Sequence, residues 1–291
     1  MARVIESETT STIEKSLPAL STKAVPIDAH CTGDHWTAQD EKRLARLIAL
    51  IAMGQATQAA HIIRELAPAA PAFTAAEIIA EAKVRLTVGT KTKSGRTGYP
   101  KEQRDGFIFE AISWVAARQT HGAEALMLAP HVSATSQGLD GLMIEITPDK
   151  TQVTRTTIFE DKCTENPRAT FRDKVIPAFL DRHQNKRSVE LVDGAATLLR
   201  TAGIDEPAAA ALAAAVMDRA QRRYRASFAL PPELDDEKQR KKLFKGYEKL
   251  TDITREQRVG ACFIVPGELR ESIEQLAVLA RAYLDELAEE L

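Results

Sequence analysis

The sequence predicts an α/β protein in which a mixed central sheet is flanked by helices. Within residues 137–162, two predicted strands, GLDGLMIEI and QVTRTTIFEDK, flank the turn Thr147-Pro148-Asp149-Lys150, whose Pro and Asp favour a tight reversal. Two short apolar runs, RYRASFAL at 223–230 and RVGACFIV at 258–265, are typical of buried strands. Helical patterns separate and follow these runs, which indicates a sheet with covered strands.

The composition is that of an ordinary globular protein. The chain has 291 residues, 44% of them hydrophobic, which is ample for a buried core. Lys and Arg number 39 against 41 Asp and Glu, for a formal charge of -2, so nucleic-acid binding would have to use local patches. Three scattered cysteines argue against a disulfide framework. No apolar run approaches the roughly 20 residues of a membrane span, so we expect a cytoplasmic protein.

The N-terminal third predicts an irregular arm followed by a helical subdomain. Residues 1–36 are rich in Ser, Thr and Glu and lack a sustained period, which favours an irregular arm. Residues 37–90 are expected to form a small helical bundle. Thr37 can cap its first helix, where apolar residues recur at helical spacing: Leu44, Leu47, Ile48 and Ile51.

The third predicted unit, residues 91–291, starts with a basic loop. Its Lys91, Lys93 and Arg96 could contact phosphates, although a solvated linker explains them equally well. The next helix, residues 106–120, is apolar nearly all round and must be buried. It carries Glu110, whose charge would be costly there unless paired or metal-bound.

The remaining elements follow in order. Residues 125–132 predict the first strand. Asn166-Pro167 starts a helix that carries Arg168 and Arg172 and is interrupted or kinked at Pro177. The later helical segments, the first of which looks inserted between core elements, are residues 189–222, 235–250 and 267–291.

Strand alternation brings three charged side chains to one rim of the predicted hairpin. Glu160 and Lys162 project from the same side of the second strand, and Asp161 from the other. Asp140 opens the first strand, whose antiparallel partner lies near Glu160. Glu145 would face the opposite side. Two carboxylates and an ammonium are what a magnesium site for phosphodiester hydrolysis requires.

The order of these residues resembles the PD-(D/E)XK nuclease superfamily. A helix with Glu110 precedes a hairpin with Asp140, and nineteen residues separate Asp140 from Glu160-x-Lys162. The resemblance covers about residues 105–230. Leu139 replaces the Pro of the motif, and the insertion at about 189–222 departs from the minimal family core.

The resemblance implies metal-assisted hydrolysis of phosphodiester bonds. Asp140 and Glu160 would bind Mg²⁺, with Mn²⁺ able to substitute, and the main-chain carbonyl of Asp161 could join them. Glu110 would complete the metal shell directly or through water. Lys162 would orient the attacking water and stabilise charge on the phosphate.

The resemblance also implies a nucleic-acid substrate, with DNA favoured over RNA. The residues expected to contact it are Gln137, Arg168, Arg172, Lys91, Lys93 and Arg96. A compact chain without an ATPase motif is similar to defence-system subunits such as the HamA proteins of Hachiman systems, which act with a helicase. This predicts an anti-phage defence or restriction effector with a helicase or ATPase partner, and leaves homo-oligomers open.

A second interpretation is that the protein has no catalytic activity. In a non-enzymatic helical interaction protein, or a nucleic-acid-binding subunit of a larger complex, Glu160 and Lys162 would form a surface pair of little energy. Burial of Glu110 and convergence of the four charged side chains would separate this interpretation from the nuclease hypothesis.

Overall fold

A computed structural model describes residues 16–93, 95–122, 125–131 and 139–291. The strands are β1 (Leu20–Val25), β2 (Thr32–Ala38), β3 (Lys91–Thr92), β4 (Gly95–Arg96), β5 (Ala125–Met127), β6 (Gly141–Ile146), β7 (Val153–Lys162), β8 (Arg222–Leu230) and β9 (Arg258–Ile264). The α-helices are α1 (Glu41–Ala52), α2 (Ala56–Glu65), α3 (Ala76–Arg85), α4 (Lys101–Thr120), α5 (Pro167–Thr170), α6 (Ile176–His183), α7 (Ser188–Thr201), α8 (Glu206–Ala213), α9 (Glu237–Leu243) and α10 (Leu269–Glu289).

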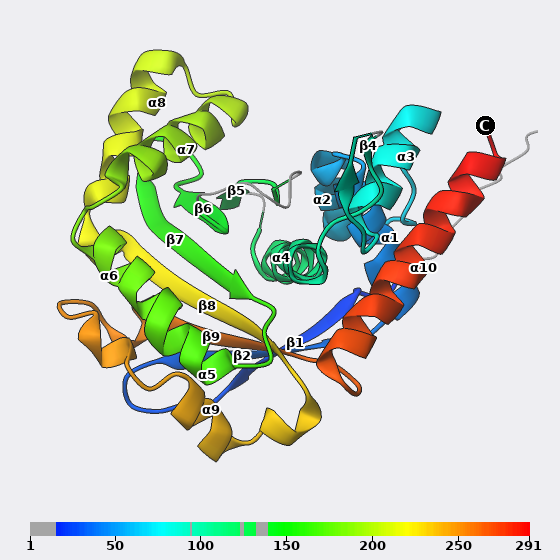
Figure 1. The fold of residues 1–291 in the computed structure, drawn as a ribbon. Coiled ribbons are helices and arrows are strands. Elements are labelled where there is room, and N and C mark those ends of the chain that lie inside the picture. The colour runs from blue at the N-terminus through cyan, green and yellow to red at the C-terminus, as the bar shows by residue number, and fades with distance from the viewer. Residues whose placement is uncertain (1–15, 94, 123–124, 132–138) are drawn as a thin grey trace, which may run out of the picture.

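The main sheet has seven strands in the order β1-β2-β9-β8-β7-β6-β5. Its four central strands, β2, β9, β8 and β7, are mutually parallel, whereas β1, β6 and β5 pair antiparallel with their neighbours. The sheet curls around α4, and helices cover both of its faces (Figure 1). The α/β class with a mixed sheet flanked by helices is therefore confirmed.

Two hydrophobic clusters, one on each face of the sheet, form the core. The inner cluster lies on the concave face and joins α1, α2, α3, α4 and α10 to strand residues such as Phe159 and Phe263. The outer cluster lies on the other face, beneath α6 and α7, and includes Leu142, Ile158 and Phe228. Neighbouring residues of β7 alternate between the two clusters, which is the period expected of a strand covered on both faces.

Helix α4 is buried along most of its length, as its sequence predicts. Phe109, Ile112 and Val115 have no exposed area, since the helix fills the hollow of the curled sheet (Figure 1). It begins at Lys101, five residues before the predicted start at residue 106. Pro100, which has extended backbone angles, sets the true boundary.

The N-terminal segment is more ordered than its composition indicates. The expectation of an irregular arm is wrong for β1 and for most of β2, because both strands belong to the main sheet. Thr37 lies in β2, and the first helix starts at Glu41 with Asp40 as its N-cap. The partner of β2 is β9, near the other end of the chain, so no local pattern could indicate this pairing.

Several boundaries also differ from expectation. The strand predicted at 125–132 ends at Met127, and the charged helix predicted at 235–250 is limited to Glu237–Leu243. A π-helical segment, Phe171–Val175, precedes α6, and Pro177 lies in the first turn of α6. Pro177 is tolerated there because the segment before it already departs from α-helical hydrogen bonding.

Close packing at the start of the β6–β7 hairpin requires glycine. A Cβ atom on Gly141 would lie 2.6 Å from Cδ2 of Phe159, its partner across the pair. Gly141 therefore lets Phe159 pack directly on the strand beside Asp140.

None of the helices in the described ranges is both long and apolar enough to cross a membrane.

Candidate active site

The β6–β7 hairpin brings Asp140, Glu160 and Lys162 together. Because Gly141 pairs with Phe159, Asp140 lies next to Glu160 at the end of the hairpin away from the turn. The Lys162 ammonium contacts Oδ2 of Asp140 and lies 2.8 Å from Oε2 of Glu160. These three side chains meet at one rim, as strand alternation predicts.

Lys162 is held as a cation. Burial alone would lower its pKa, but the carboxylates of Glu160 and Asp140 outweigh burial and raise the pKa above its ordinary value. Its side chain is only 26% exposed. Lys162 therefore offers a fixed positive charge rather than a proton acceptor.

Glu160 is buried beneath Lys162. Its Oε1 lies 2.8 Å from Nη1 of Arg182, an α6 residue that is itself buried, and its Oε2 faces Lys162. Burial and the nearby Asp140 charge raise the pKa of Glu160, while Lys162 and Arg182 oppose that rise. Both carboxylate oxygens of Glu160 thus already have cationic partners.

Glu110 does not join the three hairpin side chains. Its Oε1 accepts hydrogen bonds from the main-chain N–H of His131, at 2.8 Å, and from Nδ1 of the same residue when that nitrogen is protonated, at 3.0 Å. The hydrogen bond to Glu110 raises the pKa of His131, although burial opposes it. The partner expected for this carboxylate on an apolar helix is therefore a histidine that the sequence pattern did not single out.

A cavity of about 410 Å³ at the carboxyl end of β7 brings Glu110 near the hairpin group. Its wall contains acids from α4, from β7 and from the residue before β6, together with cations from β7, the π-helical segment and α10. Among the described residues, the charged and histidine side chains that line this wall are Glu102, Glu110, His131, Asp140, Asp161, Lys162, Lys174 and Arg270. Glu160 is not among the described residues that line it.

Asp161 projects from the opposite side of β7 to Glu160, as strand alternation predicts. Among the described residues, its Oδ1 atom is buried without a hydrogen-bond partner. Burial raises the pKa of Asp161 to about 7, with Asp140 adding to the rise and with Arg225 and the Ser227 and Ser113 hydroxyl groups opposing it. Arg225 lies over the Phe159 ring, 3.9 Å from its centroid, and donates to Ser113 on α4.

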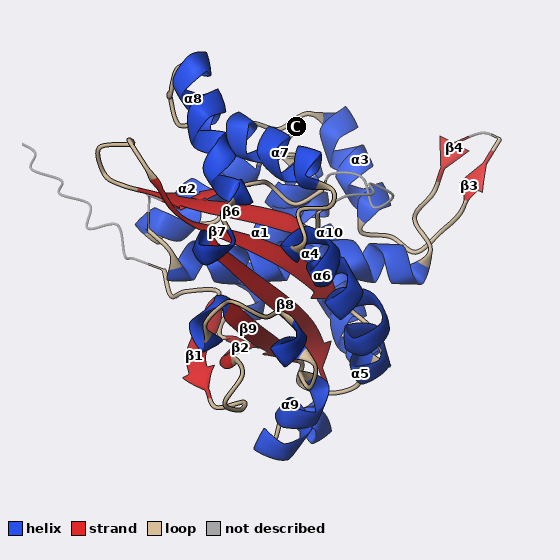
Figure 2. Ribbon diagram, turned by 90° about the vertical axis from the view of Figure 1, so that its left-hand side faces the viewer, coloured by secondary structure: helices blue, strands red, loops and turns tan. Residues whose placement is uncertain are grey.

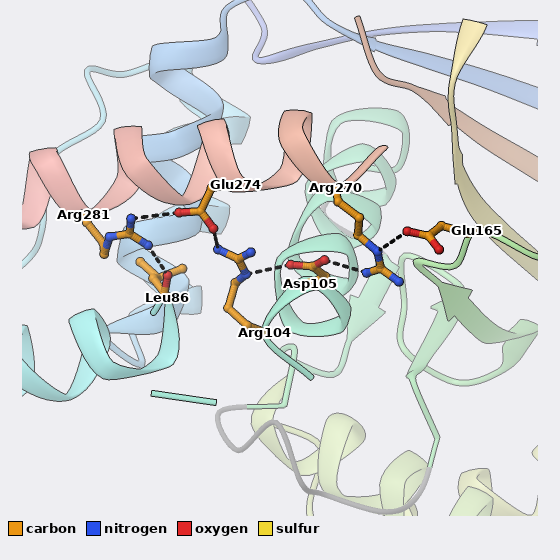
Figure 3. Close-up of polar contacts among 7 residues, drawn as sticks. All are labelled: Leu86, Arg104, Asp105, Glu165, Arg270, Glu274 and Arg281. Atoms are coloured by element: carbon orange, nitrogen blue, oxygen red, sulfur yellow. Dashed lines mark hydrogen bonds and ion pairs between the residues drawn. The ribbon is translucent and has the colours of Figure 1, made fainter. Parts of the chain in front are cut away.

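Arg270 belongs to a chain of charge contacts that leads from the inner helices to the cavity. Its Nη1 lies 2.5 Å from Oδ2 of the fully buried Asp105, and its Nε lies 3.3 Å from Glu165. Asp105 also holds Arg104, which contacts Glu274. Figure 3 shows the whole chain: Leu86, Arg281, Glu274, Arg104, Asp105, Arg270 and Glu165. This network fixes one cation on the cavity wall.

The predicted nucleic-acid contacts are dispersed. Lys91 and Arg96 lie on the small β3–β4 hairpin, which extends away from the main sheet (Figure 2), and Lys93 lies in the turn between its strands. Arg168 donates to the carbonyl groups of Leu243 and Lys245.

Arg172 is exposed and pairs with its neighbour Asp173. Gln137 lies outside the described residues. Within the described part of the chain, none of the predicted contacts lines the 410 Å³ cavity.

Sequence reasoning missed the side chains that surround the hairpin group from distant elements. Arg225 carried a signal, since a cation inside a predicted buried strand requires a partner. His131, Arg182 and Arg270 carried none, because their proximity depends on how α4, α6 and α10 pack.

The described residues contain no group of three or more His, Cys, Asp or Glu side chains placed to hold a metal ion. No protein-family model matches the chain, and a search of curated proteins likewise finds no match.

Proposed function

We propose that this protein is a metal-dependent nuclease of the PD-(D/E)XK type that hydrolyses DNA phosphodiester bonds with Mg²⁺. The observation that carries the proposal is the contact of one ammonium, Lys162, with both Asp140 and Glu160 beside an open cavity. A surface pair would leave these charges solvated, whereas Glu160 is buried and Lys162 largely so. Charge gathered at such a cost of desolvation is typical of functional sites.

The chemistry of the cavity wall fits a hard divalent cation. Asp140, Asp161 and Glu110 supply carboxylate oxygens, the ligand type that Mg²⁺ prefers, and Mg²⁺ commonly uses one or two protein carboxylates with waters and phosphate oxygens. The buried Oδ1 of Asp161 makes no close hydrogen bond to a described residue, as expected of an atom that a cation or water would satisfy. When bound, Mg²⁺ would lower the pKa of a coordinated water and polarise the phosphate.

The chain's own residues would divide the remaining work. Asp140 would hold the cation, because it lines the cavity and its contacts with Lys162 and with the main-chain N–H of Asp161 both use Oδ2. Lys162 would stabilise negative charge on the phosphate, since its neighbouring carboxylates keep it protonated. The Glu110–His131 pair would form the facing wall.

Cations on the same wall would bind the substrate backbone. Arg270 is fixed by Asp105, and Lys174 is exposed and forms no ion pair with another described residue. Phosphate groups flanking the scissile bond would replace water around these side chains. DNA remains the proposed substrate, with RNA as the comparison.

The direct test incubates the purified chain with end-labelled DNA and RNA, with Mg²⁺ or with EDTA. We expect Mg²⁺-dependent cleavage that Asp140→Asn abolishes. Asp193→Asn, an exposed change on α7, is the matched control and should cleave like the wild type.

The same assay is repeated with a helicase or ATPase partner, if one is identified by co-purification. Cleavage that survives EDTA, or that Asp140→Asn leaves intact, would contradict the proposed site. DNA binding without cleavage under every condition would favour the non-enzymatic subunit instead.

A further inference from the structure

We propose that Asp161, rather than Glu160, is the second carboxylate that holds the divalent cation beside Asp140. This inference rests on the proposed function and assigns the ligands of the same site. It departs from the expectation that Asp161 would contribute only its main-chain carbonyl.

Glu160 is occupied by protein cations. Arg182 holds its Oε1 at 2.8 Å and Lys162 holds its Oε2 at 2.8 Å. A metal ion at Glu160 would have to displace a buried guanidinium or the lysine, and would leave that cation unpaired at a large cost. Glu160 is therefore placed to anchor Lys162 rather than to bind the metal.

Asp161, in contrast to Glu160, forms no ion pair with a described residue. Its Oδ1 is buried and makes no close hydrogen bond to another described residue, although the nearby Arg225 and the Ser227 and Ser113 hydroxyl groups lower the pKa of this carboxyl. A buried oxygen without a close partner is costly. Its main-chain N–H donates to Oδ2 of Asp140 at 2.9 Å, which holds the two residues side by side. Arg225, whose charge lowers the pKa of Asp161, donates from Nη2 to Ser113 and forms no ion pair with Asp161.

A second, smaller cavity adjoins these carboxylates. It has a volume of about 10 Å³, and the described part of its wall carries three acids, Glu110, Asp140 and Asp161, together with one cation, Arg225. A space of this size holds about one water molecule or one ion. Glu160 again is not one of the described residues that line this cavity.

Two protein carboxylates are sufficient for magnesium. Mg²⁺ keeps several waters and takes its remaining ligands from substrate phosphate, so a group of three protein ligands is not required. Asp140 and Asp161 would supply the two direct ligands, and Glu110 would accept a hydrogen bond from a metal-bound water.

The test measures Mn²⁺ binding to the full chain by electron paramagnetic resonance, without substrate. We expect Asp161→Asn to weaken Mn²⁺ binding at least about tenfold, as Asp140→Asn should, while thermal unfolding shows both variants folded. Glu160→Gln should change the Mn²⁺ dissociation constant by less than about threefold, compared with the tenfold or larger change expected for Asp161→Asn. The double variant Glu160→Met with Arg182→Met removes both charges and serves if Glu160→Gln fails to fold.

The outcomes separate this inference from the proposed function. A wild type that binds no Mn²⁺ would overturn both. A wild type that binds Mn²⁺ while Asp161→Asn binds equally well, or while Glu160→Gln loses binding, would overturn the ligand assignment alone and leave the nuclease proposal standing.

Discussion

The ammonium nitrogen of Lys162 lies 2.8 Å from Oε2 of Glu160, two residues away on β7, and the same ammonium contacts Asp140, the residue before β6. One cation therefore ties the two strands of the hairpin together at the cavity. Arg182 approaches Glu160 from the other side. The charges alternate Arg182, Glu160, Lys162, Asp140, so each carboxylate of the group contacts at least one cation.

The first prediction concerns Lys162→Ala. Removing the ammonium takes away transition-state stabilisation worth several kcal/mol, so DNA cleavage should fall by roughly two orders of magnitude or more. Mn²⁺ binding should persist, because the cation that competes for Asp140 is removed. Single-turnover cleavage and Mn²⁺ titration measure the two effects separately.

Lys42→Ala provides the matched control, since Lys42 is exposed on α1. It should cleave like the wild type. Equal rates for Lys162→Ala and the wild type would leave the Glu160–Lys162 pair without a catalytic role.

The second prediction concerns Arg182→Met. Arg182 is 1% exposed and Glu160 5% exposed, so deleting the guanidinium leaves a buried carboxylate with Lys162 as its remaining cation. The free energy of unfolding should fall by about 3 kcal/mol. The double variant Glu160→Met with Arg182→Met should recover part of this loss of unfolding free energy, as measured by urea unfolding. If the double variant is destabilised as much as Arg182→Met, the loss does not come from an unpaired Glu160.

The third prediction compares Lys174 with Arg168. Lys174→Ala should weaken binding to DNA in EDTA and reduce the slope of log affinity against log salt by about 1, because Lys174 lines the cavity. Arg168→Ala should instead lower the free energy of unfolding by about 2 kcal/mol, because Arg168 donates to two carbonyl groups near α9. An unchanged salt slope for Lys174→Ala would remove that residue from the interface.

The fourth prediction is a pH dependence outside the cavity. Oε1 of Glu145 lies 3.0 Å from Nδ1 of His121, at the end of α4, and this hydrogen bond holds the pKa of Glu145 below its ordinary value. A depressed folded-state pKa stabilises the protein above the unfolded-state pKa, near 4.3, and this stability is lost as the pH falls through the folded-state value. Glu145→Gln should cost about 1 kcal/mol at pH 6, and the cost should vanish in strong acid.

Thermal unfolding of the wild type and Glu145→Gln between pH 2.5 and 7 checks this prediction. Asp193→Asn is the control for a general charge effect. A difference between wild type and Glu145→Gln that grows toward low pH would contradict the assigned sign.

The local sequence pattern predicted those helices and strands whose buried and exposed positions recur at a regular spacing along the chain. The apolar run around Phe109 predicted a buried helix because apolar residues occupy nearly every face of that segment, with Glu110 as an isolated acid among them. The hairpin alternation predicted that Asp140, Glu160 and Lys162 share a side, because strand geometry leaves two directions only. The N-terminal strands escaped prediction because β2 acquires its partner from β9, and pairing energy between distant segments leaves no local signature.

The features of the candidate site likewise fall into those that the sequence determined and those that depend on tertiary packing. The sequence by itself determined which residues alternate on β6 and β7, and hence that an ammonium and two carboxylates meet at one rim. Only the tertiary structure decided that Arg182 forms an ion pair with Glu160 and that His131 pairs with Glu110. It also decided that Oδ1 of Asp161 is buried without a close hydrogen bond to a described residue. The physical reason is that charge compensation acts through space: a carboxylate is paired by whichever cation the packing of α4, α6 and β8 brings within contact, whatever its distance along the chain.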